Sequence, residues 1–225
     1  MKNKNKVYWF LPIALLFIVL GISVSASVHS LGRKTGSNGA YMYQINERKD
    51  GFIEAKIHVI PQLDSAEFQG YVQANEERIR NLIHQGGEPI DVQVTLKRPL
   101  AADEIQLLAS ETTLQVESFL LVGKGTNNEQ VTSIIYGDLS EIPSHEEGPR
   151  GQSVEYLGVM VLQGKIVPSI SELGKLSADN RIYMVDTTMS EVRELIQNDS
   201  RLSGQPIESI SAPSPFWELM WGPES

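Results

Sequence analysis

The residues that most often perform catalysis or bind metals are few in this chain and widely spaced. There is no Cys, which excludes thiol catalysis, disulfide exchange and zinc–thiolate sites. Of the four His, only His145 has carboxylates directly beside it, at Glu146 and Glu147. One His next to two carboxylates is not a complete zinc ligand set, so this stretch is interpreted as part of a solvated loop.

Three other patterns that could carry chemistry are incomplete. Gly-Lys-Gly-Thr at residues 123–126 resembles a fragment of a phosphate loop, but the full G-x-x-x-x-G-K-[ST] pattern is absent and a tight turn is favoured. The G-x-S-x-G pattern of a serine nucleophile is also absent. The adjacent glutamates at 76–77 and 146–147 lack the spacing of two glycosidase carboxylates that face one gap. We therefore predict no catalytic residues, no cofactor and no metal site.

The C-terminal tail, residues 199–225, combines turn-forming and aromatic residues. It has four prolines, yet it also contains two of the three Trp of the chain. Phe216, Trp217, Met220 and Trp221 are the candidate partner-binding residues, because large aromatic side chains are enriched at binding hot spots. Two alternatives stay open: the tail could dock on its own domain, or it could contact a membrane interface.

The N-terminal residues have the composition of a membrane-directed leader. Three lysines within the first six residues precede an uncharged apolar run over residues 7–24. At 1.5 Å per residue, a helix of this length reaches about 27 Å, enough for a thin hydrocarbon core. The positive-inside rule makes residues 1–6 a cytoplasmic stub and the rest of the chain extracytoplasmic. Residues 7–26 are either a retained single-pass anchor or a signal peptide cleaved after Ala26, which would give a secreted protein.

The exported part is acidic and has no disulfides. The chain has 19 Lys and Arg against 28 Asp and Glu, and removal of the three leader lysines leaves 16 minus 28, or −12. This charge disfavours binding to nucleic acid and, by charge alone, to anionic lipid. Without Cys the fold depends on its hydrophobic core, which the remaining length can supply as one domain or two small ones.

The first half of the exported part is predicted to contain a tether, a strand and a long helix. Residues 27–40 are rich in Gly, Ser and Asn, which indicates a flexible tether. Within residues 41–90, a strand is predicted over residues 51–60, ended by Pro61. A helix is predicted over residues 63–85, opened by a capping box of Asp64 and Glu67. Its apolar stripe is interpreted as a core face, with a helix that binds in a partner's groove as the alternative.

Residues 91–198 show an ordered series of strand and helix patterns. Strands are predicted near residues 91–96, 113–122 and 181–185, and a further strand at 154–161 is predicted to continue through a turn near Gly164 to Val167. The other predictions are a strand extension or hairpin at 131–136, an exposed loop at 137–153, and helices near 102–112, 169–180 and 188–198. The β-α-β-β-α-β order predicts an α+β fold of the ferredoxin-like type, with both helices on one face of a four-stranded antiparallel sheet. The other face needs a cover, for which the helices at 63–85 and 188–198 are the candidates.

Part of this region resembles the propeptides of subtilisin-type proteases. The stretch Gly-Val-Met-Val-Leu-Gln-Gly at 158–164 and the stretch Leu-Ser-Ala-Asp-Asn-Arg-Ile at 176–182 follow the strand, helix end and edge strand of those modules. The resemblance implies a ferredoxin-like fold that acts as an intramolecular chaperone and inhibits by inserting its C-terminal tail into the protease. Because a further helix follows the last strand here and a membrane segment precedes the module, only the fold is carried over, and no functional residues.

Three functions are open at this point. The lack of reactive clusters favours a non-enzymatic, membrane-anchored extracytoplasmic module that binds a protein partner or its own assembly. The resemblance suggests an inhibitor or chaperone of an exported serine protease. An exported hydrolase would require His58, His84 or His145 to meet carboxylates in a cleft.

Overall fold

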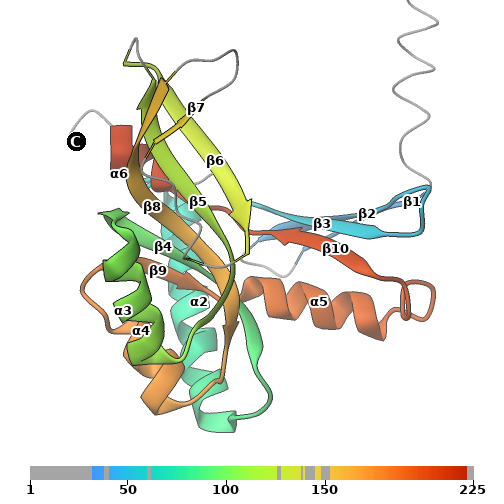
Figure 1. Ribbon diagram of the computed structural model, residues 1–225. Coiled ribbons are helices and arrows are strands. Elements are labelled where there is room, and N and C mark those ends of the chain that lie inside the picture. The colour runs from blue at the N-terminus through green and yellow to red at the C-terminus, as the bar shows by residue number, and fades with distance from the viewer. Residues whose placement is uncertain are drawn as a thin grey trace, which may run out of the picture.

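Two β-sheets and the helices packed against them form a mixed α+β fold, seen in the computed structural model of the chain (Figure 1). The structure describes residues 32–37, 41–59, 62–125, 128–137, 139, 145–147 and 153–221. The predicted membrane segment at residues 7–24 and the cleavage position after Ala26 lie outside these residues. In the part that is described, no helix combines the length and the apolar character needed to cross a bilayer.

The larger sheet comes from the middle of the chain and is antiparallel throughout. Its strands are β4 (Ile90–Leu100), β5 (Gln115–Gly125), β6 (Gln130–Tyr136), β8 (Ser153–Ile166) and β9 (Ile182–Asp186), in the order β6-β5-β8-β4-β9, and β7 (His145–Glu147) pairs with the start of β8. The β5–β6 hairpin selects one of the two alternatives predicted for residues 131–136. β8 is one long strand, and Gly164, where a turn was expected, instead pairs with both neighbouring strands.

One face of the larger sheet is covered by the helices that connect its strands. α3 (Ala102–Thr112) links β4 to β5, whereas the π-helical turn η2 (Ile170–Gly174) and the short α4 (Lys175–Ser177) link β8 to β9. Their apolar side chains join those of the strands in the main core, with members such as Ile105, Leu108, Leu173, Leu176, Val94 and Leu162. This layer holds the strands in register and leaves the opposite face of the sheet for other elements.

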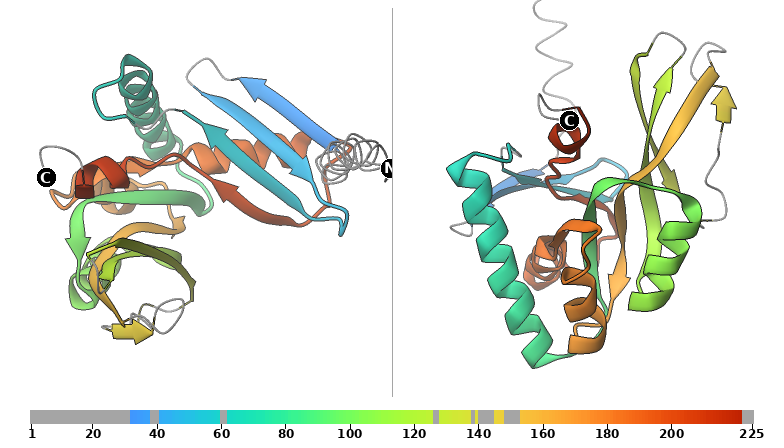
Figure 2. Two further views of the ribbon diagram at one scale, coloured as in Figure 1. Left: turned by 90° about the horizontal axis from the view of Figure 1, so that it is seen from above. Right: turned by 90° about the vertical axis from the view of Figure 1, so that its left-hand side faces the viewer.

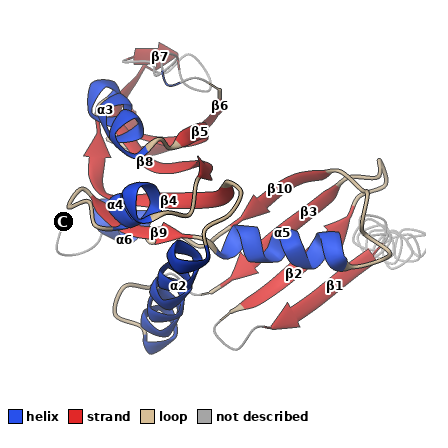
Figure 3. Cartoon of the chain, turned by 90° about the horizontal axis from the view of Figure 1, so that it is seen from below, coloured by secondary structure: helices blue, strands red, loops and turns tan. Residues whose placement is uncertain are grey.

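The smaller sheet brings together both ends of the described chain. It consists of β1 (Gly32–Ser37), β2 (Met42–Glu47), β3 (Ile53–His58) and β10 (Ile207–Ser211), and β10 runs parallel to β3. α5 (Thr188–Asn198) crosses one face of this sheet (Figure 3). The first half of α2 (Ala66–Gln85) adds Phe68 and Tyr71 to the same core. β1 replaces part of the tether that was predicted at residues 27–40.

α2 packs on both cores. It was a predicted candidate to cover the free face of the larger sheet, but it does not cover that face. Its second half lies beside η2 and contributes Ile79 to the main core, on the same side as α3 (Figure 2). Its N-cap is Ser65, whose Oγ accepts a hydrogen bond from the Phe68 N–H at 3.1 Å, so the predicted capping box with Asp64 is wrong. Serine at this position satisfies one of the free N–H groups of the first turn.

The free face of the larger sheet is covered instead by the C-terminal tail. α6 (Phe216–Trp221) packs on Val122, Met160 and Val161, which form a small core of their own. The sequence prediction named the helices at 63–85 and 188–198 as candidates for this role. α5 takes a part of it, since it packs with Met184 of β9 and its Arg193 forms an ion pair with Asp91 of β4. Tail docking, one of the three alternatives for residues 199–225, is the arrangement that the structure has.

Candidate functional site

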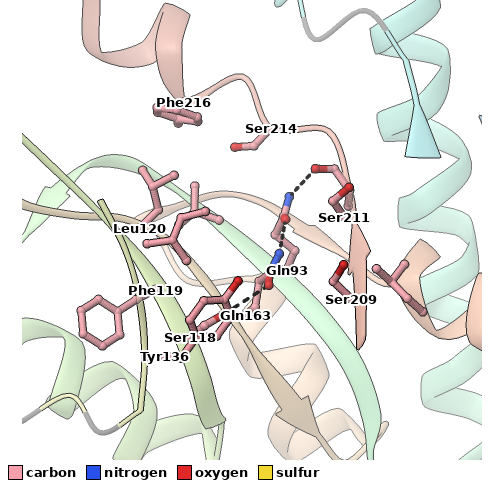
Figure 4. A pocket seen from close by; sticks show the side chains of 14 residues that line it. Gln93, Ser118, Phe119, Leu120, Tyr136, Gln163, Ser209, Ser211, Ser214 and Phe216 are labelled. Atoms are coloured by element: carbon pink, nitrogen blue, oxygen red, sulfur yellow. Dashed lines mark hydrogen bonds between the residues drawn. The ribbon is translucent and has the colours of Figure 1, made fainter. Parts of the chain in front are cut away.

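A groove of about 330 Å³ lies between the free face of the larger sheet and the chain that leads from β10 into α6 (Figure 4). Its floor comes from β4, β5 and β8, and its sides come from β6, from β10 and from Phe216. Its lining includes no Asp, Glu, Lys, Arg or His. The volume lies near the lower end of the range of about 300–1,000 Å³ that is usual for ligand pockets.

A chain of hydrogen bonds between neutral side chains crosses the floor of the groove. The Ser118 hydroxyl donates to Gln163 Oε1 at 3.2 Å, and Gln163 Nε2 donates to Gln93 Oε1 at 2.9 Å. Gln93 Nε2 in turn donates to the backbone carbonyls of Ala212 and Pro213, at 3.3 and 3.1 Å. Gln93 and Ser118 are both buried, and these bonds give their polar groups hydrogen-bond partners within the protein.

The two carbonyls fix the direction of the whole chain. A carbonyl oxygen only accepts, so the Gln93 amide must turn its NH₂ group toward Ala212 and Pro213 and its oxygen toward Gln163. Gln163 must then present its own NH₂ group to Gln93, and Ser118 must donate to the remaining oxygen. The Ser118 oxygen therefore keeps acceptor capacity at the groove, where an N–H or O–H group of a ligand could bind.

Residues 212–215, which we call the strap, are tied to β4 of the larger sheet. Thr95 Oγ1 and Ser214 Oγ lie 2.9 Å apart in a hydrogen bond, beside the contacts of Gln93. Beyond the strap, a carboxylate oxygen of Glu218 on α6 accepts a hydrogen bond at 2.7 Å from the Leu63 N–H, just before α2. The strap is thus held by β4, and α6 is held by the segment before α2.

The aromatic residues of the tail divide between the domain and solvent. Phe216, Met220 and Trp221 pack against the small core under α6. Trp217 is 47 % exposed and contacts both Phe216 and Trp221 edge to face. Of the four candidate partner-binding residues, Phe216 lines the groove and Trp217 is the most exposed.

A second polar cluster is buried where α2, β9 and α5 meet. Asp186 is fully buried and accepts hydrogen bonds from the Tyr71 hydroxyl and, at 2.8 Å, from the Thr188 N–H. Burial raises the pKa of Asp186, and burial next to this carboxyl raises the pKa of Tyr71. Asn75 accepts from the Thr187 N–H at 3.0 Å and donates to the Val185 carbonyl. These bonds join α2 to β9 and to the start of α5.

The residues screened for catalysis are not brought together. His58 lies on β3 and His84 in the last turn of α2, in different parts of the fold. His145 is on β7, whose side chains are not described. Gly123 and Gly125 belong to strand β5 and not to a phosphate-binding loop. Within the described residues, no group of three or more His, Cys, Asp or Glu side chains could hold a metal ion.

The residues of the groove were missed by the sequence prediction. The alternation Val92, Val94, Leu96 predicted a half-buried strand whose intervening residues face water. Gln93 and Thr95 are instead buried, because the strap covers the second face of β4. Comparison of the chain with protein-family models, with curated proteins and with solved structures finds no match.

Proposed function

We propose that this protein is a non-enzymatic protein-interaction module, held by residues 7–24 in a membrane with its folded part outside the cytoplasm. The observation that carries the proposal is the open groove lined only by neutral side chains, with the exposed Trp217 packed against Phe216, which lines the groove. Acid–base and nucleophilic catalysis depend on groups that can titrate or be activated near the substrate. A surface of amides, hydroxyls and aromatic rings is instead suited to recognition.

We also propose that the larger sheet is a ferredoxin-like unit with an added strand. Without β6, the order β9-β4-β8-β5 places the fourth strand beside the first and the third between the first and second, as a split β-α-β arrangement requires. α3 and the η2–α4 segment occupy the two crossover positions. This order supports the resemblance to subtilisin-type propeptides at the level of the fold alone.

The second candidate function is inhibition or chaperoning of an exported serine protease. The strand order favours it, but the tail of this chain is helix α6 packed on the sheet, whereas a propeptide presents its tail extended. An inhibitory role would require α6 to leave the sheet. Rates of a panel of exported serine proteases with micromolar protein test this function, and unchanged rates across the panel would exclude it.

Site-specific photo-crosslinking of the full-length chain in its own host cells tests the main proposal. A photoreactive phenylalanine analogue is placed at Tyr136 or Trp217, beside the groove, and at Ile170 as a control. Tyr136 is 76 % exposed and Ile170, which begins η2 on the other face of the sheet, is 75 % exposed, so the two positions are matched in accessibility.

The expected result is a defined protein adduct from positions 136 and 217 that is absent at position 170. Adducts of the same masses and yields at all three positions, or none at positions 136 and 217, would contradict the proposal. An adduct with lipid alone at position 217 would favour the third alternative for the tail, contact with a membrane interface.

A further inference from the structure

Strand β6 is an edge of the larger sheet, and its backbone presents alternate residues to the outside. At the two ends of the β5–β6 ladder, Gly125 N–H donates to Glu129 at 2.8 Å and Gly137 N–H donates to Glu117 at 3.1 Å. Hydrogen-bonded pairs alternate along an antiparallel ladder, so the odd-numbered residues between these ends bond to β5. The N–H and C=O groups of Gln130, Thr132, Ile134 and Tyr136 therefore point away from the sheet, and no described strand pairs with them.

This edge lacks the usual protection against strand pairing. β6 reads Gln-Val-Thr-Ser-Ile-Ile-Tyr, with no charge, no proline and several β-branched residues. Among the other edge strands, β1 contains Arg33 and Lys34, and β10 contains Glu208. Charged residues and prolines are the common devices that keep edge strands from pairing with other chains.

The outward-bonding residues of β6 also line the groove. Ile134 is 60 % exposed and Tyr136 is 76 % exposed, and both lie on the groove side, whereas Ile135 packs on the main core behind the sheet. A strand added to β6 would place every second side chain over the groove. Because the groove lining has no charge, charged side chains at those positions would lose their hydration without a partner of opposite sign.

We propose that β6 binds an extended, uncharged segment of a partner protein by strand addition, with apolar side chains at alternate positions entering the groove. Backbone hydrogen bonds to Thr132 and Ile134 would supply affinity, and the groove would supply specificity. This proposal rests on the protein-interaction function proposed above and names its ligand. A second copy of the chain is disfavoured as the occupant, because the exported part carries a net charge of −12 from 16 basic and 28 acidic residues.

The test uses the full-length chain in lipid nanodiscs and a pool of end-blocked heptapeptides. Val, Ile, Leu or Phe alternates in them with Ser, Thr, Asn or Gln, and peptides retained by the protein are identified by mass spectrometry against empty nanodiscs. Thr132→Pro removes one outward N–H but no bond to β5, a change that edge strands tolerate. Thr132→Val is the matched control, since it keeps the N–H and nearly the same size.

We expect the parent and T132V to retain the same peptides, and T132P to bind them with roughly tenfold lower affinity. This is the effect of losing one backbone hydrogen bond and leaving the peptide carbonyl without a donor. Peptides N-methylated on alternate amides give a readout that does not alter the protein. Methylation of one alternating set should abolish retention, and methylation of the other set should leave it.

Several results would overturn the proposal. These are equal retention by T132P and the parent, equal effects of both methylation series, no retained peptide at millimolar concentration, or a dimer of the parent that T132P dissociates. The proposed function fails separately, through crosslinks that do not distinguish Tyr136 from Ile170. Crosslinks that stay specific to the groove in T132P would preserve the function and refute strand addition.

Discussion

Gln93→Glu is the sharpest test of how the groove floor is built. The substitution keeps the size and shape of the side chain but replaces the NH₂ group with a second oxygen. The carbonyls of Ala212 and Pro213, which now accept from Gln93, would face an oxygen without a proton. We therefore expect the variant to destabilise the strap at neutral pH and to recover part of that stability when the new carboxyl is protonated and can donate.

The magnitude follows from the number of bonds lost. Two hydrogen bonds at about 0.5–1.5 kcal/mol each account for roughly 1–3 kcal/mol, and a buried carboxylate facing carbonyl oxygens adds to this cost. We expect a loss of about 3 kcal/mol or more in the free energy of unfolding at neutral pH. For a domain of this size, that corresponds to a fall of roughly 6–12 °C in Tm.

Thermal unfolding of the full-length chain, followed by near-ultraviolet circular dichroism, measures this effect at neutral and mildly acidic pH. Gln115→Glu is the control, because Gln115 is an exposed residue of β5 and its change should cost less than about 0.5 kcal/mol. If Gln93→Glu melted within about 2 °C of the parent at both pH values, the two carbonyls would not set the orientation of the chain. The direction deduced for Gln163 and Ser118 would then fail as well.

Three further predictions concern the buried cluster and the tail. Because burial raises the pKa of Asp186, the folded chain keeps a proton that the unfolded chain releases above about pH 4. The protonated carboxyl therefore contributes fully to the free energy of unfolding below that pH, and this contribution is lost as the pH rises toward the folded-state pKa. Asp186→Asn should remove this pH dependence, which urea unfolding at a series of pH values would detect as a flatter profile than the parent's. Tyr71→Phe should cost about 1–3 kcal/mol in urea unfolding, since it removes a hydroxyl bonded to Asp186 and Thr188 in a buried site, and a cost near zero would show that the hydroxyl is not needed there. Trp217→Ala should change the free energy of unfolding by less than about 1 kcal/mol, whereas Met160→Ala, at a fully buried position under α6, should cost about 2–5 kcal/mol; equal losses would mean that Trp217 is part of the core.

The elements in the middle of the chain could be predicted because their signals are local. The apolar alternation around Val92 and the periodic pattern of residues 102–112 each depend on a few neighbouring residues, and β4 and α3 form where they predict. The same is true of α5, which spans the predicted residues 188–198. Local periodicity decides the type of an element better than its exact ends.

The smaller sheet could not be predicted as a whole: β1, β2 and β3 pair with their neighbours in sequence, but the fourth strand comes from the other end of the chain. β10 pairs with β3 across about 150 residues, and neither strand carries a local mark of that partner. β10 lies in a turn-rich tail with Pro206 and Pro213 on either side, which favoured an irregular segment. β1 contains two glycines and reads as tether until β2 is placed beside it.

The groove was hidden from the sequence for a related reason, since its two halves come from distant segments. The alternation predicts Gln93 as an outward-facing polar residue of a half-buried strand, and in the structure the strap covers it. The floor and the wall then depend on each other: the strap carbonyls orient Gln93, Gln163 and Ser118, and these side chains hold the strap on the sheet. The affinity of a ligand that bonds to Ser118 would therefore depend on the position of the tail. Any displacement of α6 would change both the shape and the hydrogen-bonding pattern of the groove.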